Sequence, residues 1–219
     1  MNTKLNRCLL TRAEVDEATQ WLKERNLIPH GLSCKNPDIA FVCANIGDGD
    51  ICDLGADGSW VLQNAVKMGL KGEKHGIDLI IPKDAVYEGF EMIEGDLMNT
   101  PYPDGKFDYV TCMSVIEHSV DFKLFAKECA RILKPGGKLI VSADYFNPKP
   151  DTSEMKLYNL SWNVLGPDEV ISLISELHNV GIETTSDIDL MVQEAVINPK
   201  FCSPANVSYT FIYLEFVKK

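Results

Sequence analysis

The chain has 219 residues, of which 45% are hydrophobic, and its formal net charge is -11 at pH 7. This length and apolar content can bury one sizeable core, so we expect a single domain over residues 1–219. The acidic surplus argues against a groove for the phosphate backbone of a nucleic acid, because such grooves need clustered Lys and Arg.

The seven cysteines are odd in number and include no C-x-x-C pair. Cys52 and Cys112 lie in apolar runs, where a thiol behaves as a small hydrophobic group, so we expect reduced core residues. The first 18 residues lack a long apolar run, and no stretch approaches the ~18 apolar residues of a membrane span. We therefore expect a cytoplasmic protein without a membrane-embedded segment.

The first predicted elements form a helical cap over residues 1–48. Thr11 and Glu14 have the spacing of a capping box, and apolar residues follow at helical intervals, which predicts a helix over residues 11–25. The stretch NPDIAFVCANI predicts a second short helix, and GDGD a turn after it.

Strands and helices then alternate along the chain. Predicted strands are ICDLG, KHGIDLI, FEMIEGD, FDYVTCM and KLIVSA, with helices over residues 58–68 and 120–133. Pro167 begins a further helix that Gly181 ends, before the predicted strands IETTSDIDL and SYTFIYLEFV. This alternation indicates a mainly parallel sheet covered on both faces.

Acidic residues end successive predicted strands. Asp53, Asp78 and Asp96 end the first three, residues 114–118 follow the fourth, and Asp144 ends the fifth. Ligands of open α/β sheets bind beyond the carboxyl ends of the strands, so these residues should line a site. Asp78 has the spacing from the glycine turn at which a carboxylate accepts both ribose hydroxyls of an adenosine-type ligand.

The glycine turn DLGADGSW discriminates between such ligands. A pyrophosphate must approach the N-terminus of the following helix, and Asp57 places a negative charge there. S-adenosylmethionine has no phosphate, and its ammonium and sulfonium groups attract carboxylates. The turn therefore favours S-adenosylmethionine over NAD.

Four stretches together resemble the class I S-adenosylmethionine-dependent methyltransferases: ICDLGADGSW, HGIDL, IEGDLMNTPYPDGKFDYVTCMSVIEH and LKPGGKLIVS. The resemblance implies a doubly wound, Rossmann-like α/β fold. Its sheet would have seven mostly parallel strands, an antiparallel last strand, and helices on both faces. Residues 49–143 would form the cofactor-binding half and residues 144–219 the acceptor side.

The resemblance also implies which residues contact the cofactor, S-adenosyl-L-methionine. They are Asp53, Gly55, Ala56, Asp57, Asp78, Leu79, Asp96, Leu97, Met113 and Ser114. Asp78 would hold the ribose, and Asp96 with Leu97 would flank the adenine. Asp53 has two open readings, contact with the cofactor's ammonium or capping of the loop's own amides. When residues 53–59 are aligned with the family's motif D-x-G-x-G-x-G, Asp57 stands in place of the second glycine and Ser59 in place of the third.

Glu117 and His118 are the His–carboxylate pair next to the predicted site. His titrates near neutrality, so His118 could accept a proton from a hydroxyl acceptor as the methyl group moves. Alignment alone also suffices for many methyl transfers, so pocket lining or a structural role remain open for His118. The aspartates of GDGDICDLGADG lack the terminal Glu of an EF-hand, so we expect no metal site.

The sequence thus predicts methyl transfer from S-adenosylmethionine to a small molecule that bears a hydroxyl group, and it leaves the oligomeric state open. One alternative is a methyltransferase-like, non-catalytic subunit that binds a partner, which the altered glycine loop supports. The other is an NAD-dependent short-chain dehydrogenase, because Tyr145 and Lys149 give Y-x-x-x-K. Prolines at 148 and 150 oppose the shared helix face that this motif needs.

Overall fold

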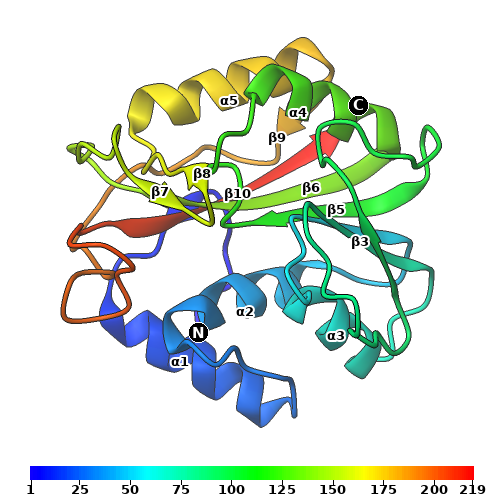
Figure 1. The fold of residues 1–219 in the computed structure, drawn as a ribbon, viewed down its shortest axis with the longest axis horizontal. Coiled ribbons are helices and arrows are strands. Elements are labelled where there is room, and N and C mark those ends of the chain that lie inside the picture. Colours follow the sequence, from blue (N-terminus) through cyan, green and yellow to red (C-terminus); the bar gives the residue numbers. More distant parts are fainter.

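The computed structural model describes all 219 residues and shows a central sheet with helices on both faces (Figure 1). One face carries α4 (Phe122–Ile132) and α5 (Pro167–Asn179). The other carries α1 (Arg12–Glu24), α2 (Asn36–Asn45) and α3 (Trp60–Lys67). The strands in the middle of the sheet are mostly buried because helices cover both faces. The predicted Rossmann-like α/β class is confirmed.

The strand order shows where a ligand site should lie. The strands are β1 (Arg7–Cys8), β2 (Ile51–Leu54), β3 (Lys74–Asp78), β4 (Glu91–Glu94), β5 (Phe107–Met113), β6 (Leu133–Tyr145), β9 (Ile182–Thr184) and β10 (Thr210–Lys218). Their order is β1-β10-β6-β5-β2-β3-β4, with β9 also paired to β10. The strands from β4 to β6 are parallel, whereas β10 is antiparallel to β6. The order reverses between β2 and β5, so the switch point lies at their carboxyl ends.

All seven predicted strands are present, and β1 adds an eighth that the sequence did not reveal. The predicted strand IETTSDIDL is much shorter, because β9 ends at Thr184. Beyond it, the Asn6 side chain donates to the hydroxyls of Thr185 and Ser186 and accepts from the Glu215 amide of β10, so a side chain takes the place of a strand partner there. A two-stranded hairpin of β7 (Lys156–Leu157) and β8 (Leu160–Ser161) was also missed, since two-residue strands carry no readable periodicity.

The predicted N-terminal cap is built into the sheet. The capping box of Thr11 and Glu14 is present at the start of α1, as predicted. β1 pairs with β10, and Phe41 of α2 stacks on Tyr213 of β10 with ring centroids 4.1 Å apart. Because the first and last segments share one sheet, we propose that residues 1–219 fold as one unit. No helix combines the length and apolar character needed to cross a membrane.

Candidate active site

A tight loop joins β2 to α3 at the switch point. Gly55, Asp57, Gly58 and Ser59 have positive φ values of 73°, 24°, 75° and 40°. Ser59 ends the loop as the N-cap of α3, where its hydroxyl accepts a hydrogen bond from the Leu62 amide at 3.0 Å. Asp57 and Ser59 thus adopt the backbone conformation that usually favours glycine, and Asp is among the side chains that tolerate it best.

The buried carboxylate of Asp53 anchors this loop to the sheet. Its carboxylate is buried, with one oxygen accepting from the Ser59 hydroxyl at 2.7 Å and the other from the Thr111 hydroxyl at 2.6 Å. Burial raises the pKa of Asp53 to about 6. Both oxygens are therefore engaged within the protein, and the geometry favours a loop-anchoring role that acts through hydroxyls rather than through loop amides.

Asp78 lies beside the loop at the end of β3. Its Oδ2 accepts from the Asp57 amide at 3.0 Å and its Oδ1 from the Ile80 amide at 3.2 Å. Leu79, next to it, is exposed. Asp57 and Asp78 together place two carboxylates near the N-terminus of α3, where they would repel a pyrophosphate and attract a sulfonium or an ammonium. The loop therefore fits S-adenosylmethionine.

The remaining predicted cofactor contacts divide between two places. Asp96 follows β4, where its Oδ1 accepts from the Met98 amide at 2.8 Å, and Leu97 is buried. Met113 ends β5. Ser114 follows with a φ of 55°, and its hydroxyl accepts from the Lys35 ammonium at 2.7 Å, so it faces the N-terminal cap.

Glu117 and His118 lie in the turn after β5, and no hydrogen bond joins their side chains. Glu117 is buried, and its Oε1 accepts from the Asp144 amide at 3.3 Å. The His118 ring is partly buried, 5.7 Å from the Tyr158 ring between centroids. Burial and the charge of Lys35 lower the pKa of His118 to about 4. Its imidazole is therefore neutral near pH 7 and able to accept a proton.

Sequence reasoning missed the charged residues that the N-terminal cap brings to these strand ends. Lys35 and Asp38 reach Ser114 from the start of α2. His30 contacts Trp60, the first residue of α3, with ring centroids 4.3 Å apart. The available signal was Asp38 itself, because it is the one acid within the otherwise apolar stretch NPDIAFVCANI. A lone acid in a buried helix usually has a polar partner.

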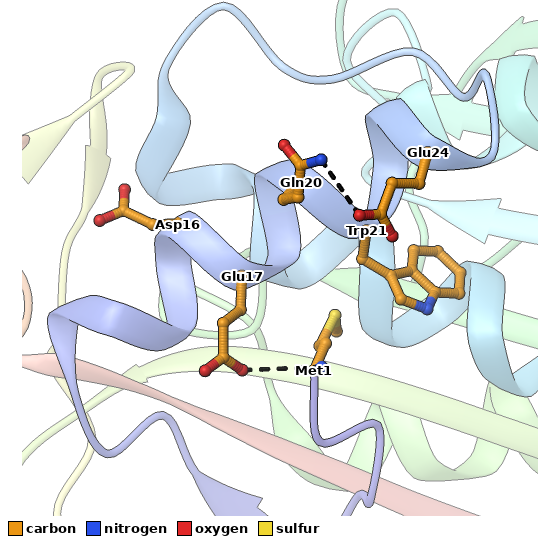
Figure 2. A pocket seen from close by; sticks show the side chains of 6 residues that line it. All are labelled: Met1, Asp16, Glu17, Gln20, Trp21 and Glu24. Carbon is orange, nitrogen blue, oxygen red and sulfur yellow. Dashed lines mark hydrogen bonds and ion pairs between the residues drawn. The ribbon is translucent and has the colours of Figure 1, made fainter.

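One other feature of the surface lies outside this site. A hollow of about 360 Å³ lies beside α1. Figure 2 shows the side chains that line it, those of Met1, Asp16, Glu17, Gln20, Trp21 and Glu24. All of these residues belong to the first 24, and none ends a parallel strand of the sheet. The structure contains no group of three or more His, Cys, Asp or Glu side chains placed to hold a metal ion.

Comparison with known proteins agrees with this geometry. The family described as "Methyltransferase domain" matches residues 54–141, which include the glycine loop, Asp78 and the turn after β5. The demethylmenaquinone methyltransferase of Geobacillus sp. (strain WCH70) is 35% identical over 100 residues, which make up 42% of this chain and 42% of that protein. The matched region thus spans less than half the length of this curated relative.

Solved structures are similar over more of the chain. The [4+2]-cyclase SpnF has a TM-score of 0.63 at 16% identity, covering 95% of this chain and 97% of that one. The geranyl diphosphate C-methyltransferase from Streptomyces coelicolor A3(2), solved with Mg²⁺, geranyl diphosphate and S-adenosyl-L-homocysteine, has a TM-score of 0.59 at 12% identity, covering 95% and 80%. At these identities the similarity shows the fold alone.

The switch-point loop, the acids at its strand ends and the family match define one class. Residues 54–141 match the methyltransferase domain family, and the fold is that of the class I S-adenosylmethionine-dependent methyltransferases, for which S-adenosylmethionine is the methyl donor.

Replacing Asp78 with alanine should weaken binding of S-adenosylhomocysteine by about 1–3 kcal/mol, because a hydrogen bond between a charged group and the ligand's ribose would be lost. Titration calorimetry would measure the change. Asp84→Ala is the matched control, since it removes an exposed acid from the segment after β3. Equal affinity for the Asp78 and Asp84 variants would contradict the ribose role.

Proposed function

We propose that this protein is an enzyme that transfers the methyl group of S-adenosyl-L-methionine to a small-molecule acceptor, and that a hydroxyl group receives it. The bound cofactor supplies a methyl group already activated on a sulfonium. The observation that carries the proposal is the pair of carboxylates beside the glycine loop, in which Asp78 accepts from the Asp57 amide at 3.0 Å. That pair suits a cationic cofactor and opposes a pyrophosphate.

His118 is the proposed general base. It lies in the turn after β5, and its imidazole is unprotonated at neutral pH, as a base must be, although burial and Lys35 make it a weaker base than a free histidine. Glu117 is directed into the interior and makes no bond to His118, so we assign the proton transfer to His118 alone. The net charge of -11 supports a small or neutral acceptor over a polyanion.

The relatives support the coarse class of acceptor. Two of these relatives are named for demethylmenaquinone and geranyl diphosphate, and both compounds are small molecules. The identity of the acceptor for this chain remains part of the proposal, because the matched region covers 42% of the curated relative.

The two alternatives differ in their support. The short-chain dehydrogenase motif needs Tyr145 and Lys149 side by side on one helix face. Here the Tyr145 hydroxyl donates to the Leu190 carbonyl, whereas the Lys149 ammonium pairs with Glu169. The two residues therefore face different partners and share no helix. A non-catalytic, partner-binding subunit is supported by the two non-glycine residues at positive φ in the loop, Asp57 and Ser59.

Two measurements test the proposed function. Calorimetry should show binding of S-adenosylhomocysteine and none of NAD. Incubation with labelled S-adenosylmethionine and pools of small metabolites should then label a hydroxyl-bearing compound. Transfer to purified RNA alone would overturn the small-molecule proposal. Binding of S-adenosylhomocysteine without transfer to any acceptor would favour the non-catalytic subunit.

A further inference from the structure

The short hairpin of β7 and β8 lies beside the turn that carries His118. The Ser161 amide donates to the Ser119 hydroxyl at 3.0 Å, directly after His118 in the chain. The Asn163 amide donates to the Glu117 carbonyl at 2.9 Å, directly before it. The hairpin is therefore attached to the residues on both sides of His118.

The base of this hairpin is fixed in the core. Trp162, directly after β8, is 1% exposed, and its amide donates to the Met155 carbonyl at 3.0 Å, which continues the pairing beyond β7. Its indole N–H donates to the buried carboxylate of Asp144 at 2.8 Å. Leu157 of β7 packs against the same apolar cluster as Trp162. The hairpin thus holds its tip in a defined place next to His118.

The tip of the hairpin exposes an aromatic ring. Tyr158 and Asn159 form its two-residue turn, with φ values of 55° and 64°. Turns with two positive φ values favour Asn and Gly, and a bulky residue is strained there. The Tyr158 side chain is 82% exposed, so packing within the protein gives little return for this strain. Strained residues of this kind cluster at ligand-binding and active sites.

The Tyr158 ring forms an aromatic corner with the ring of His118. Their centroids are 5.7 Å apart, and their planes meet at 79°. His118 Nδ1 is buried without a hydrogen-bond partner, which leaves Nε2 as the ring nitrogen for a ligand. Aromatic rings associate in offset-stacked or edge-to-face arrangements, so a planar ligand ring on Tyr158 would carry a substituent to His118. The corner therefore fits an aromatic compound with a hydroxyl group at its edge.

The proton chemistry of His118 also favours an aromatic acceptor. Burial and the charge of Lys35 lower the pKa of its imidazole to about 4. A phenolic hydroxyl has a pKa of about 10, as in tyrosine, whereas an aliphatic hydroxyl is close to water, at about 15.7. Transfer of a proton to a weak base is less unfavourable from the more acidic hydroxyl, so His118 suits a phenol better than an aliphatic alcohol.

We propose that Tyr158 is a specificity-determining residue that binds the aromatic ring of the methyl acceptor, and that the acceptor is a phenol. The ligand ring stacks on Tyr158 and presents its hydroxyl group to His118 Nε2. Transfer of the methyl group to the phenol oxygen leaves an aryl methyl ether and S-adenosylhomocysteine, with the phenolic proton on His118. This inference rests on the proposed function, because it names the class of hydroxyl compound that the enzyme takes.

Two pairs of probes separate aromatic character from size. Phenol is compared with cyclohexanol, and 2-naphthol with decahydro-2-naphthol, because each pair keeps the carbon skeleton and the hydroxyl group while the second member lacks the aromatic ring. Calorimetry with the protein bound to S-adenosylhomocysteine should show at least one aromatic compound binding about three- to tenfold more tightly than its saturated partner.

Variants test whether the Tyr158 ring is responsible. Tyr158→Asn should remove the preference for the aromatic compound and keep the hairpin, because Asn tolerates a positive φ better than Tyr. Tyr158→Phe retains the ring and should retain the preference. Ile171→Asn is the control, because it introduces the same amide at a 57% exposed position on α5 and should leave the preference intact. Thermal unfolding would verify that each variant is folded.

The failures are distinguishable. Equal binding, or no binding, of both members of both pairs would overturn the role of Tyr158, as would a preference that persists in Tyr158→Asn or is lost in Tyr158→Phe or Ile171→Asn. Loss of the fold in Tyr158→Asn would also overturn it, by making the ring a part of the packing. Methyl transfer to hydroxyl compounds without an aromatic preference would overturn the inference and leave the proposed function standing. An aromatic preference without methyl transfer to any compound would support the Tyr158 contact and contradict the proposed function.

Discussion

Replacing His118 with alanine should lower turnover of a hydroxyl acceptor by roughly 10²- to 10⁴-fold, because a general base acts on the transition state. The affinity for S-adenosylhomocysteine should stay nearly unchanged, since no cofactor contact is assigned to this ring. Steady-state kinetics with the acceptor and calorimetry with S-adenosylhomocysteine would measure the two quantities. His178→Ala is the matched control, because that ring lies at the end of α5 beside Glu183.

The pH profile sharpens this test. Burial and the Lys35 charge lower the pKa of His118 to about 4, so the imidazole remains neutral from pH 8 down to about pH 5. The rate in the wild type should therefore fall only as the pH approaches 4, with no inflection from this ring near 6.5. A loss confined to the KM for the acceptor would instead assign His118 to pocket lining. Turnover near the wild-type value would rule out the base.

Replacing Gly55 with alanine should lower the free energy of unfolding by about 2–5 kcal/mol and abolish measurable binding of S-adenosylhomocysteine. An added Cβ at Gly55 would lie 2.5 Å from Val115 Cγ2, and the φ of 73° strains any residue with a Cβ. The left-handed backbone costs about 1–2 kcal/mol, and overpacking adds about 1–3 kcal/mol. Since β2 and the turn after β5 must separate, the loop should lose its shape.

Gly69→Ala is the control for the backbone contribution alone. Gly69 has a φ of 71°, and an added Cβ there meets no atom within 4 Å. Its cost should therefore be about 1–2 kcal/mol, without an effect on cofactor binding. Urea denaturation would compare the two variants, and Val115→Ala in the Gly55→Ala background should recover part of the loss. Equal destabilisation at both glycines would contradict the contact with Val115.

Local patterns in the sequence were sufficient for most of the fold. The capping box of Thr11 and Glu14, the helical spacing of apolar residues and the short buried strands each depend on neighbours within one turn or one strand. The order of acids at strand ends was readable for the same reason, because parallel strands bring their carboxyl ends to one edge. Glycine spacing and strand-end acids also identified the class.

Contacts between distant segments decided the rest. β1 forms because it pairs with the edge of β10, about 200 residues later in the chain. Its two residues show no local periodicity from which a strand could be predicted. Glu117 and His118 are adjacent in sequence, yet packing directs Glu117 toward Asp144 and leaves His118 beside Tyr158.

The charged residues around Lys35 show most clearly what could not be predicted from the sequence. Lys35 and Asp38 belong to the N-terminal cap, whereas Glu117 follows β5 and Asp144 lies near the end of β6, some 80 to 110 residues later. Sequence alone determined which acids this protein carries and which of them end strands. Only the tertiary structure decided which of these acids are buried together, because burial and the spacing of charges depend on how the cap packs against β5 and β6.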